Sequence, residues 1–392
     1  MSAETARQFE ALERQAARLM AVFTNAGCEA VAPAIIQPAD VFLDVIGEDL
    51  RARTYVFTDP DGHELCLRPD LTVPTCRLHL SRDIAADEPS RYCYNGPAFR
   101  FQPHGTNAAH PNEFRQAGVE LIAQPDAQQA ETEVLDLILK ALQEIGLGAL
   151  QVRIGDLALF HALLGDLEMP ERARQRLRAQ FWRHEAFRTA LRRLTASPAG
   201  SLAGLPADLI ARLDPADRTA SEAIVSRYLD DNAIELIGTR SLAEITGGLL
   251  AALADSRAEP IPRATTDLIE QYLAIRGPAV EAAQRIEGLI AHIGPRTAMA
   301  LAAHHRRLDL MERAGLDVAG FEFSAEFGRS LEYYTGFVFD IISPALGPAS
   351  PIAGGGRYDS LMKAVGTAYD IPAVGSAIHT ERLLTIANGG IR

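Results

Sequence analysis

Polar side chains that could bind a small ligand gather in four segments of otherwise apolar, strand-like sequence. These segments are residues 67–72, 99–120, 328–336 and 353–359. Their most informative side chains are Asp70, Thr72, Arg100, Gln116, Glu120, Arg329, Tyr333 and Tyr334. Carboxylates bind an ammonium group, arginine and glutamine bind a carboxylate, and tyrosine or glutamate binds a ring N–H. Lining one pocket, these residues would suit a small zwitterion.

Each segment, taken alone, also has a purely structural interpretation. An isolated arginine and glutamate in a sheet form an ordinary ion pair or a solvated face. Three successive glycines, residues 354–356, are typical of a tight turn or of close backbone packing. The functional interpretation therefore depends on the four segments lining the same pocket.

The residues between these segments predict the elements that position them. Apolar residues at three- and four-residue spacing predict a helix over residues 5–25. Alternation over residues 53–67, with a turn at Asp61–Gly62, predicts a hairpin. Further strands are expected over 92–100, 113–123 and 150–154, and a helix over 127–145.

The character of the sequence changes in the middle of the chain. Leu, Ala, Arg and Glu with helical periodicity dominate residues 156–315. Strand-like sequence returns over 320–342, 354–358 and 374–386. The sequence therefore predicts a mixed α and β core, residues 1–155 and 316–392, interrupted by a mainly helical insertion, residues 156–315.

Charge and cysteine usage exclude several kinds of partner. A net charge of −13 is opposite to the basic balance of most nucleic-acid binders, so tRNA is not expected as a partner. The four cysteines form no CxxC motif and no zinc-ligand spacing with a histidine. The adjacent His304 and His305 cannot easily share a ligand site on one helix. No signal peptide and no apolar span of about 20 residues is present. We expect a cytoplasmic protein with no metal and no cofactor.

The four segments, in this order, resemble the catalytic core of class II histidyl-tRNA synthetase. Residues 67–72 resemble its Leu-Arg-Pro-Glu-x-Thr segment, and Arg100 matches the motif 2 arginine. Residues 329–336 and 354–359 resemble the histidine signature and its glycine-rich partner, and residues 374–383 resemble motif 3. The resemblance implies an α+β fold in which an antiparallel sheet is flanked by helices.

The resemblance also implies a role for each polar side chain of the pocket. Asp70 and Thr72 would hold the amino group of histidine. Gln116 and Arg329 would meet its carboxylate, and the motif 2 residue Arg100 is also expected among the histidine-binding residues. Glu120 with Tyr333 or Tyr334 would surround the imidazole, the side chain that offers a second polar ring nitrogen.

Two departures from the synthetase pattern point away from tRNA aminoacylation. The sequence runs only to Arg392 after motif 3, so no anticodon-binding domain is expected. The motif 2 loop, residues 101–114, contains no Lys or Arg, although nucleotidyl transfer needs cations against a triphosphate. His379 also replaces a glycine that is usual in motif 3. The residues expected in a vestigial nucleotide site are Arg100, Gln102, Asn112 and Arg382.

A retained histidine pocket, a weakened nucleotide site and no anticodon-binding domain are the combination found in one known family. In this combination the sequence resembles the regulatory subunits that partner the short form of ATP phosphoribosyltransferase. Membership would imply a non-catalytic protein that activates the short-form catalytic subunit at the first step of histidine biosynthesis. It would also imply feedback by L-histidine and a homodimer, paired near residues 32–42, within a larger hetero-oligomer. Two alternatives stay open: a histidine-activating enzyme, either a truncated synthetase or an amino-acid ligase, and a histidine-binding protein with an unrelated partner.

Overall fold

The chain forms two compact units, each with its own core. The computed structural model describes residues 5–43, 46–103, 105–107, 109–195, 202, 205–234, 241–257, 260–329 and 331–387. One unit comprises Met1–Asp166 and Tyr272–Arg392, and the other comprises Leu167–Gln271.

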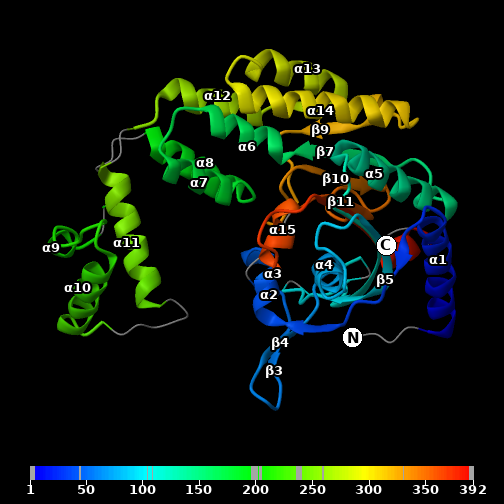
Figure 1. Ribbon diagram of the computed structural model, residues 1–392, viewed down its shortest axis with the longest axis horizontal. Helices are drawn as coiled ribbons and strands as arrows, with labels where there is room; N and C mark the ends of the chain where they lie inside the picture. The colour runs from blue at the N-terminus through cyan, green and yellow to red at the C-terminus, as the bar shows by residue number, and fades with distance from the viewer. Residues whose placement is uncertain are drawn as a thin grey trace. The chain divides into compact units, whose positions relative to one another are not determined.

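A nine-stranded sheet is the framework of the first unit (Figure 1). Its spatial order is β1 (Glu29–Ala30), β5 (Ser90–Phe99), β6 (Glu113–Ile122), β12 (Ala373–His379), β11 (Ala353–Arg357), β10 (Phe337–Ile342), β7 (Gln151–Asp156), β9 (Glu322–Ser324) and β8 (Arg276–Pro278). Neighbouring strands are antiparallel except in the β1–β5 and β7–β9 pairs. The predicted antiparallel sheet is confirmed, and it brings strands from both ends of the chain together at its centre.

Helices pack against this sheet. They are α1 (Ala6–Asn25), α4 (Thr72–Leu80), α5 (Ala127–Glu144), α6 (Leu157–Asp166), α13 (Ala279–Ile290), α14 (Pro295–Arg313), α15 (Asp359–Ala364) and α16 (Thr380–Ala387). The predicted first helix is confirmed: Thr5 and Gln8 form a capping box, and its apolar stripe, including Leu19 and Phe23, is buried. Helix α5 contacts α1, α14 and β12, and α14 also contacts α6 and α13 (Figure 1).

The predicted hairpin belongs to a separate three-stranded sheet. Strand β4 (Glu64–Leu67) pairs on its two sides with β2 (Ile36–Pro38) and β3 (Val56–Thr58). Gly62, with a φ of 91°, lies in the turn between β3 and β4. The short helices α2 (Ala39–Leu43) and α3 (Glu48–Arg51) lie between β2 and β3 in the chain. This arrangement places Arg68 to Thr72 directly after β4.

The second unit consists of helices. They are α7 (Glu171–Gln180), α8 (His184–Thr195), α9 (Ala207–Ile210), α10 (Arg218–Asp231), α11 (Leu242–Arg257) and most of α12 (Arg263–Leu273). Leu209, Leu213, Val225 and Leu250 are among the residues of one buried cluster. Among the described helices of both units, none is long and apolar enough to cross a membrane.

Several predicted boundaries differ from the structure. The expected strand 320–342 is β9 and β10 separated by irregular backbone, because residues 325–329 and 331–336 leave the sheet to place polar side chains in the site. The expected segment 374–386 divides into β12 and α16. Strand β8 was not predicted, since three residues within helical sequence give no periodicity. Residues 156–315 contribute to both compact units, and the proposed division at residues 155 and 315 stays a prediction.

Candidate functional site

A buried carboxylate, that of Glu120 on β6, is the centre of the candidate site. Its Oε1 accepts hydrogen bonds from Thr72 Oγ1 at 2.7 Å and from the Tyr94 hydroxyl at 2.8 Å. Its Oε2 accepts a hydrogen bond from the Tyr358 hydroxyl. Glu120 has no exposed surface. We call Glu120, Thr72, Tyr94 and Tyr358 the carboxylate cage.

Burial sets the protonation of this cage. Removal from water raises the pKa of Glu120 to about 7, and the hydrogen bonds from the three hydroxyls oppose that rise. Burial also raises the pKa of the neighbouring Asp70, against the attraction of the Arg100 guanidinium. A buried carboxylate that changes charge near neutral pH is typical of a binding or catalytic site.

A row of glycines makes room for these side chains. Cross-strand pairing places four glycines on the sheet face that carries Glu120. They are Gly118, Gly354, Gly356 and Gly375, and we call them the glycine floor. A Cβ on Gly375 would overlap the Glu120 carboxylate, and a Cβ on Gly354 would overlap the Arg329 guanidinium. The glycines are therefore needed for close approach of the site side chains to the backbone.

Two adjacent tyrosines form a wall beside the cage. The Tyr333 hydroxyl donates to Asp70 Oδ2 at 3.4 Å, and Asp70 Oδ1 accepts from the backbone N–H of Val73 at 3.2 Å. The Tyr333 ring centroid lies 4.8 Å from that of Tyr334 and 5.9 Å from that of Tyr358. Hydrogen bonds and ring contacts thus join Asp70, Tyr333 and Tyr334 to the cage.

The predicted carboxylate partners have different surroundings. Arg329 forms an ion pair with Asp340 on β10, and its guanidinium carbon lies 5.8 Å from the Tyr334 ring centroid. Arg100 donates through Nε to the carbonyl oxygen of Pro69 at 2.8 Å. The buried Oε1 of Gln116 has no hydrogen-bond partner among the described residues. A buried polar atom of this kind is typical of a site that a ligand completes.

A cavity of about 220 Å³ is lined by three of the four predicted nucleotide-site residues, Arg100, Gln102 and Arg382. Its lining includes Arg53, Arg100, Gln102, His110, Arg329, His379, Glu381 and Arg382. Asn112 holds the two ends of the motif 2 loop together. Its side-chain oxygen accepts a hydrogen bond from the Gln102 N–H at 3.1 Å, and its carbonyl oxygen accepts one from the Arg100 N–H at 2.8 Å. Arg100, Gln102 and Arg382 thus lie together, and Asn112 has an indirect role.

Guanidinium groups dominate the electrostatics of this cavity. Burial, with the neighbouring arginines, lowers the pKa of His379 well below its usual value and also lowers that of His110, so both rings are neutral at pH 7. The same causes lower the pKa of Arg382 to about 10, which leaves it charged. The cavity is therefore cationic, with Glu381 as the acidic side chain in its lining.

The sequence suggests that the nucleotide site has lost its cations, but the cavity contains arginines from other segments. The loop itself contains no Lys or Arg, but Arg53 reaches it from the segment before β3. Arg53 donates to the Phe101 carbonyl oxygen at 3.0 Å and to Gln102 Oε1 at 2.7 Å. Arg382 donates to the carbonyl oxygens of Ala109 and Pro351. Cations are therefore present at the loop, although Arg53 and Arg382 both donate to carbonyl oxygens of loop residues. His104 lies outside the described residues.

The sequence assigned no role to four residues that the structure places in the site: Tyr94, Tyr358, Asp340 and Arg53. Tyr94 pairs across strands with Gly118, two residues from Glu120, so a tyrosine opposite a glycine near a buried acid was the available signal. Asp340 lies within the apolar strand β10, where an acidic residue between Phe339 and Ile341 was a second signal. The sequence holds no comparable signal for Arg53.

Comparison with known proteins agrees with this geometry. The family model described as histidyl-tRNA synthetase matches residues 4–209 and 248–383. The ATP phosphoribosyltransferase regulatory subunit of Agrobacterium fabrum is 34% identical over 358 residues, which are 90% of this chain and 91% of the relative. That of Mesorhizobium japonicum is 34% identical over 376 residues, 94% of this chain and 96% of the relative. This chain belongs to the histidyl-tRNA synthetase-like family of ATP phosphoribosyltransferase regulatory subunits.

Solved structures confirm the class II fold of this family member. An ATP phosphoribosyltransferase regulatory subunit/histidyl-tRNA synthetase from Bacillus halodurans superposes with a TM-score of 0.68 at 21% identity, covering all of this chain and 82% of the other. A histidyl-tRNA synthetase from Nostoc gives a TM-score of 0.61 at 14% identity, covering 98% and 73% of the two chains.

The raised pKa of Glu120 predicts a pH-dependent contribution to stability. The pKa in the folded state, about 7, exceeds the ordinary value of 4.5, so folding favours the protonated form. The contribution is complete below pH 4.5 and is lost as the pH rises to about 7. Relative to Glu120→Gln, the wild-type free energy of unfolding should fall by about 3 kcal/mol between pH 4.5 and pH 8 in urea titrations. A constant difference would contradict an ionisable, buried cage.

The glycine floor predicts a large effect of a single methyl group. Gly375→Ala should lower the free energy of unfolding by about 2 kcal/mol or more, because the new Cβ overlaps the Glu120 carboxylate and approaches the Val119 carbonyl oxygen. The matched control is Gly288→Ala in α13, where a Cβ meets nothing within 4 Å and helix propensity favours alanine by about 1 kcal/mol. Equal thermal midpoints for the two variants would contradict the crowding.

Proposed function

We propose that this protein is a non-catalytic regulatory subunit that activates a short-form ATP phosphoribosyltransferase and senses L-histidine. Two kinds of observation support the proposal. The curated relatives that carry the regulatory-subunit name match over nearly their whole length. Several side chains assigned to histidine lie around Glu120: Thr72 donates to it, and Tyr333, which contacts Tyr334 and the cage residue Tyr358, donates to Asp70.

The cage suits the imidazole of histidine. Three hydroxyls already donate to Glu120, which fixes the carboxylate and leaves acceptor capacity on Oε2 for a ring N–H. Asp70 would hold the ammonium group, as the second buried carboxylate of the pocket, with Thr72 beside it. Arg329 and Arg100 would bind the ligand carboxylate with Gln116.

Absence of aminoacylation is part of the proposal. The motif 2 loop supplies no cation, and the arginines nearest to it, Arg53 and Arg382, donate to loop carbonyls. The ring of His379 occupies the cavity lining where a glycine is usual in the synthetase motif. Each charge-assisted phosphate contact that is lost removes about 1.5–3 kcal/mol of stabilisation.

One observation favours the alternative of a histidine-activating enzyme. Four arginines line the cavity beside the amino-acid cage, and such a cavity can attract a triphosphate. The alternative requires adenylate formation, which the regulatory proposal excludes.

The quaternary structure follows from the same proposal. We place a homodimer contact near residues 32–42, supported by the exposed Ile35 and Ile36 and by Val56 and Phe57 on the same small sheet. The catalytic subunit would complete a hetero-oligomer, and no tRNA is a partner. The four buried, free cysteines support the expected cytoplasmic location.

A pair of assays tests the regulatory role. A short-form catalytic subunit should gain activity when this protein is added, and the activity of the mixture should fall with added histidine. The purified protein alone, with Mg²⁺, ATP and histidine, should give no ATP–pyrophosphate exchange above background. A full-length histidyl-tRNA synthetase is the positive control for exchange. Exchange as fast as that of the full-length synthetase would establish the alternative of a histidine-activating enzyme. If adding this protein leaves the activity of the catalytic subunit unchanged, the regulatory proposal is wrong.

Calorimetry tests the cage as the histidine site. Histidine should bind the wild-type protein, and Glu120→Gln should weaken binding about tenfold or more, because the charged acceptor of the ring N–H is lost. Histidine methylated at its ring nitrogens should bind the wild-type protein about as weakly as histidine binds the Glu120→Gln variant. Glu133→Gln, on α5 and paired with Arg91, is the control and should retain wild-type affinity. Equal affinity of both variants would place histidine elsewhere.

A further inference from the structure

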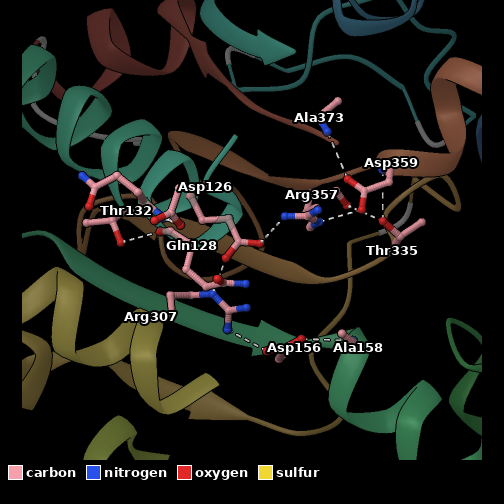
Figure 2. A network of polar contacts seen from close by, with 12 residues as sticks. Asp126, Gln128, Thr132, Asp156, Ala158, Arg307, Thr335, Arg357, Asp359 and Ala373 are labelled. Atoms are coloured by element: carbon pink, nitrogen blue, oxygen red, sulfur yellow. Dashed lines mark hydrogen bonds and ion pairs between the residues drawn. The ribbon is translucent and has the colours of Figure 1, made fainter. Parts of the chain in front are cut away.

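A second buried network of charges lies beneath the cage. Arg307 on α14 donates through Nε to Glu131 Oε2 at 2.5 Å and through Nη1 to Asp156 Oδ2 at 2.6 Å. Glu131 lies on α5 and Asp156 at the end of β7, and all three side chains are almost fully buried. Figure 2 shows Arg307 reaching toward the strand end where Asp156 lies. Asp156 also accepts from the Ala158 N–H at 3.0 Å, at the start of α6.

The network continues from Glu131 to the segment that carries Tyr358. Arg357 Nη1 lies 3.5 Å from Glu131 Oε1, and Arg357 Nε donates to Asp359 Oδ2 at 2.7 Å. These two residues flank Tyr358, whose hydroxyl donates to Glu120. A single guanidinium therefore contacts an acid on α5 and an acid at the start of α15, and Figure 2 shows Arg357 beside Asp359.

The same segment is also joined to the tyrosine wall. The Thr335 N–H donates to the Arg357 carbonyl oxygen at 2.8 Å, and the Asp359 N–H donates to Thr335 Oγ1 at 3.1 Å. Thr335 directly follows Tyr333 and Tyr334. Asp359 Oδ1 in addition accepts from the Ala373 N–H at 3.0 Å at the start of β12. The two segments that supply Tyr358 and the wall are thus fixed to each other by Thr335 and the backbone groups of Arg357 and Asp359.

We infer that Arg357 is a positioning residue of the histidine pocket: its fork, held between Asp359 and the Glu131 carboxylate that Arg307 anchors, keeps the Tyr358 hydroxyl on Glu120. The inference rests on the proposed histidine site. Arg357 itself does not contact the carboxylate cage in the hydrogen bonds of the described residues; it acts through the backbone of residues 357–359. The planar guanidinium is needed because two acids must be met from two directions.

The substitution Arg357→Lys separates this role from charge. Lysine keeps a cation near Glu131, so the fold should persist, but a single ammonium cannot reproduce the fork. We expect histidine affinity to fall about tenfold, as for loss of a hydrogen bond to a charged group. Arg306→Lys is the matched control: Arg306 is the neighbour of Arg307 on α14 and forms an exposed pair with Asp126. It should leave affinity unchanged.

A double-mutant cycle identifies the route. Tyr358→Phe removes the hydroxyl directly and should weaken histidine binding by a similar factor. If Arg357 acts through Tyr358, the double variant should bind histidine about as well as the single variant with the lower affinity. The two losses of affinity would then not multiply. Multiplied effects, or wild-type affinity of Arg357→Lys, would overturn the inference.

A measurement without ligand keeps the inference testable if histidine does not bind. The Tyr358 hydrogen bond lowers the pKa of Glu120 against the effects of burial and of the Asp70 charge. Arg357→Lys should therefore move the Glu120 titration to higher pH, measured as unfolding stability relative to the same variant with Glu120→Gln. A wild-type titration would overturn the positioning role. Failure of histidine to bind the wild-type protein, with a shifted titration, would instead remove only the proposed ligand.

Discussion

The burial of one carboxylate on the glycine floor is the constraint that organises this protein. Glu120 can lie against the sheet only because Gly375 carries no side chain, and it can remain there only because three hydroxyls donate to it. A buried acid without partners would be costly. The donors come from α4, β5 and the end of β11, so satisfying one side chain requires the strand order that brings these elements together.

The ionic network around Arg307 also supplies partners to buried carboxylates, here between helices and the end of a strand. Glu131 and Asp156 are two acids with almost no exposed surface, and a single arginine lies between them. Replacing a buried ion pair by apolar residues is often neutral for stability, so such a pair is weak evidence of stabilisation alone. Its value here is geometric: it fixes α14, α5 and the end of β7 in one arrangement, and Arg357 extends that arrangement to the ligand pocket.

Elements with strong periodicity could be predicted from the sequence, and elements defined by long-range pairing could not. The stripe of α1 and the hairpin turn at Gly62 depend on neighbours in the chain. The irregular segment that carries Tyr333 has strand-like composition, and only its contacts with Asp70 and the 357–359 segment explain its course. Asp70, Thr72 and Glu120 were identified by resemblance and by residue type. Arg53 was missed because a cation can enter a cavity from a segment about 50 residues away, and no local pattern reports it.

The two ligand sites share residues, which changes how the arginines should be interpreted. Arg100 and Arg329 line the cationic cavity and are also the predicted partners of the amino-acid carboxylate. If the proposed amino-acid site is correct, their presence does not by itself indicate nucleotide chemistry. The other two arginines, Arg53 and Arg382, donate to backbone carbonyls of the loop and of its neighbour. A guanidinium that holds carbonyls has fewer N–H groups left for a phosphate, and stabilisation of a transition state depends on donors that are already in place. A cavity can thus be cationic and still be poorly organised for nucleotidyl transfer.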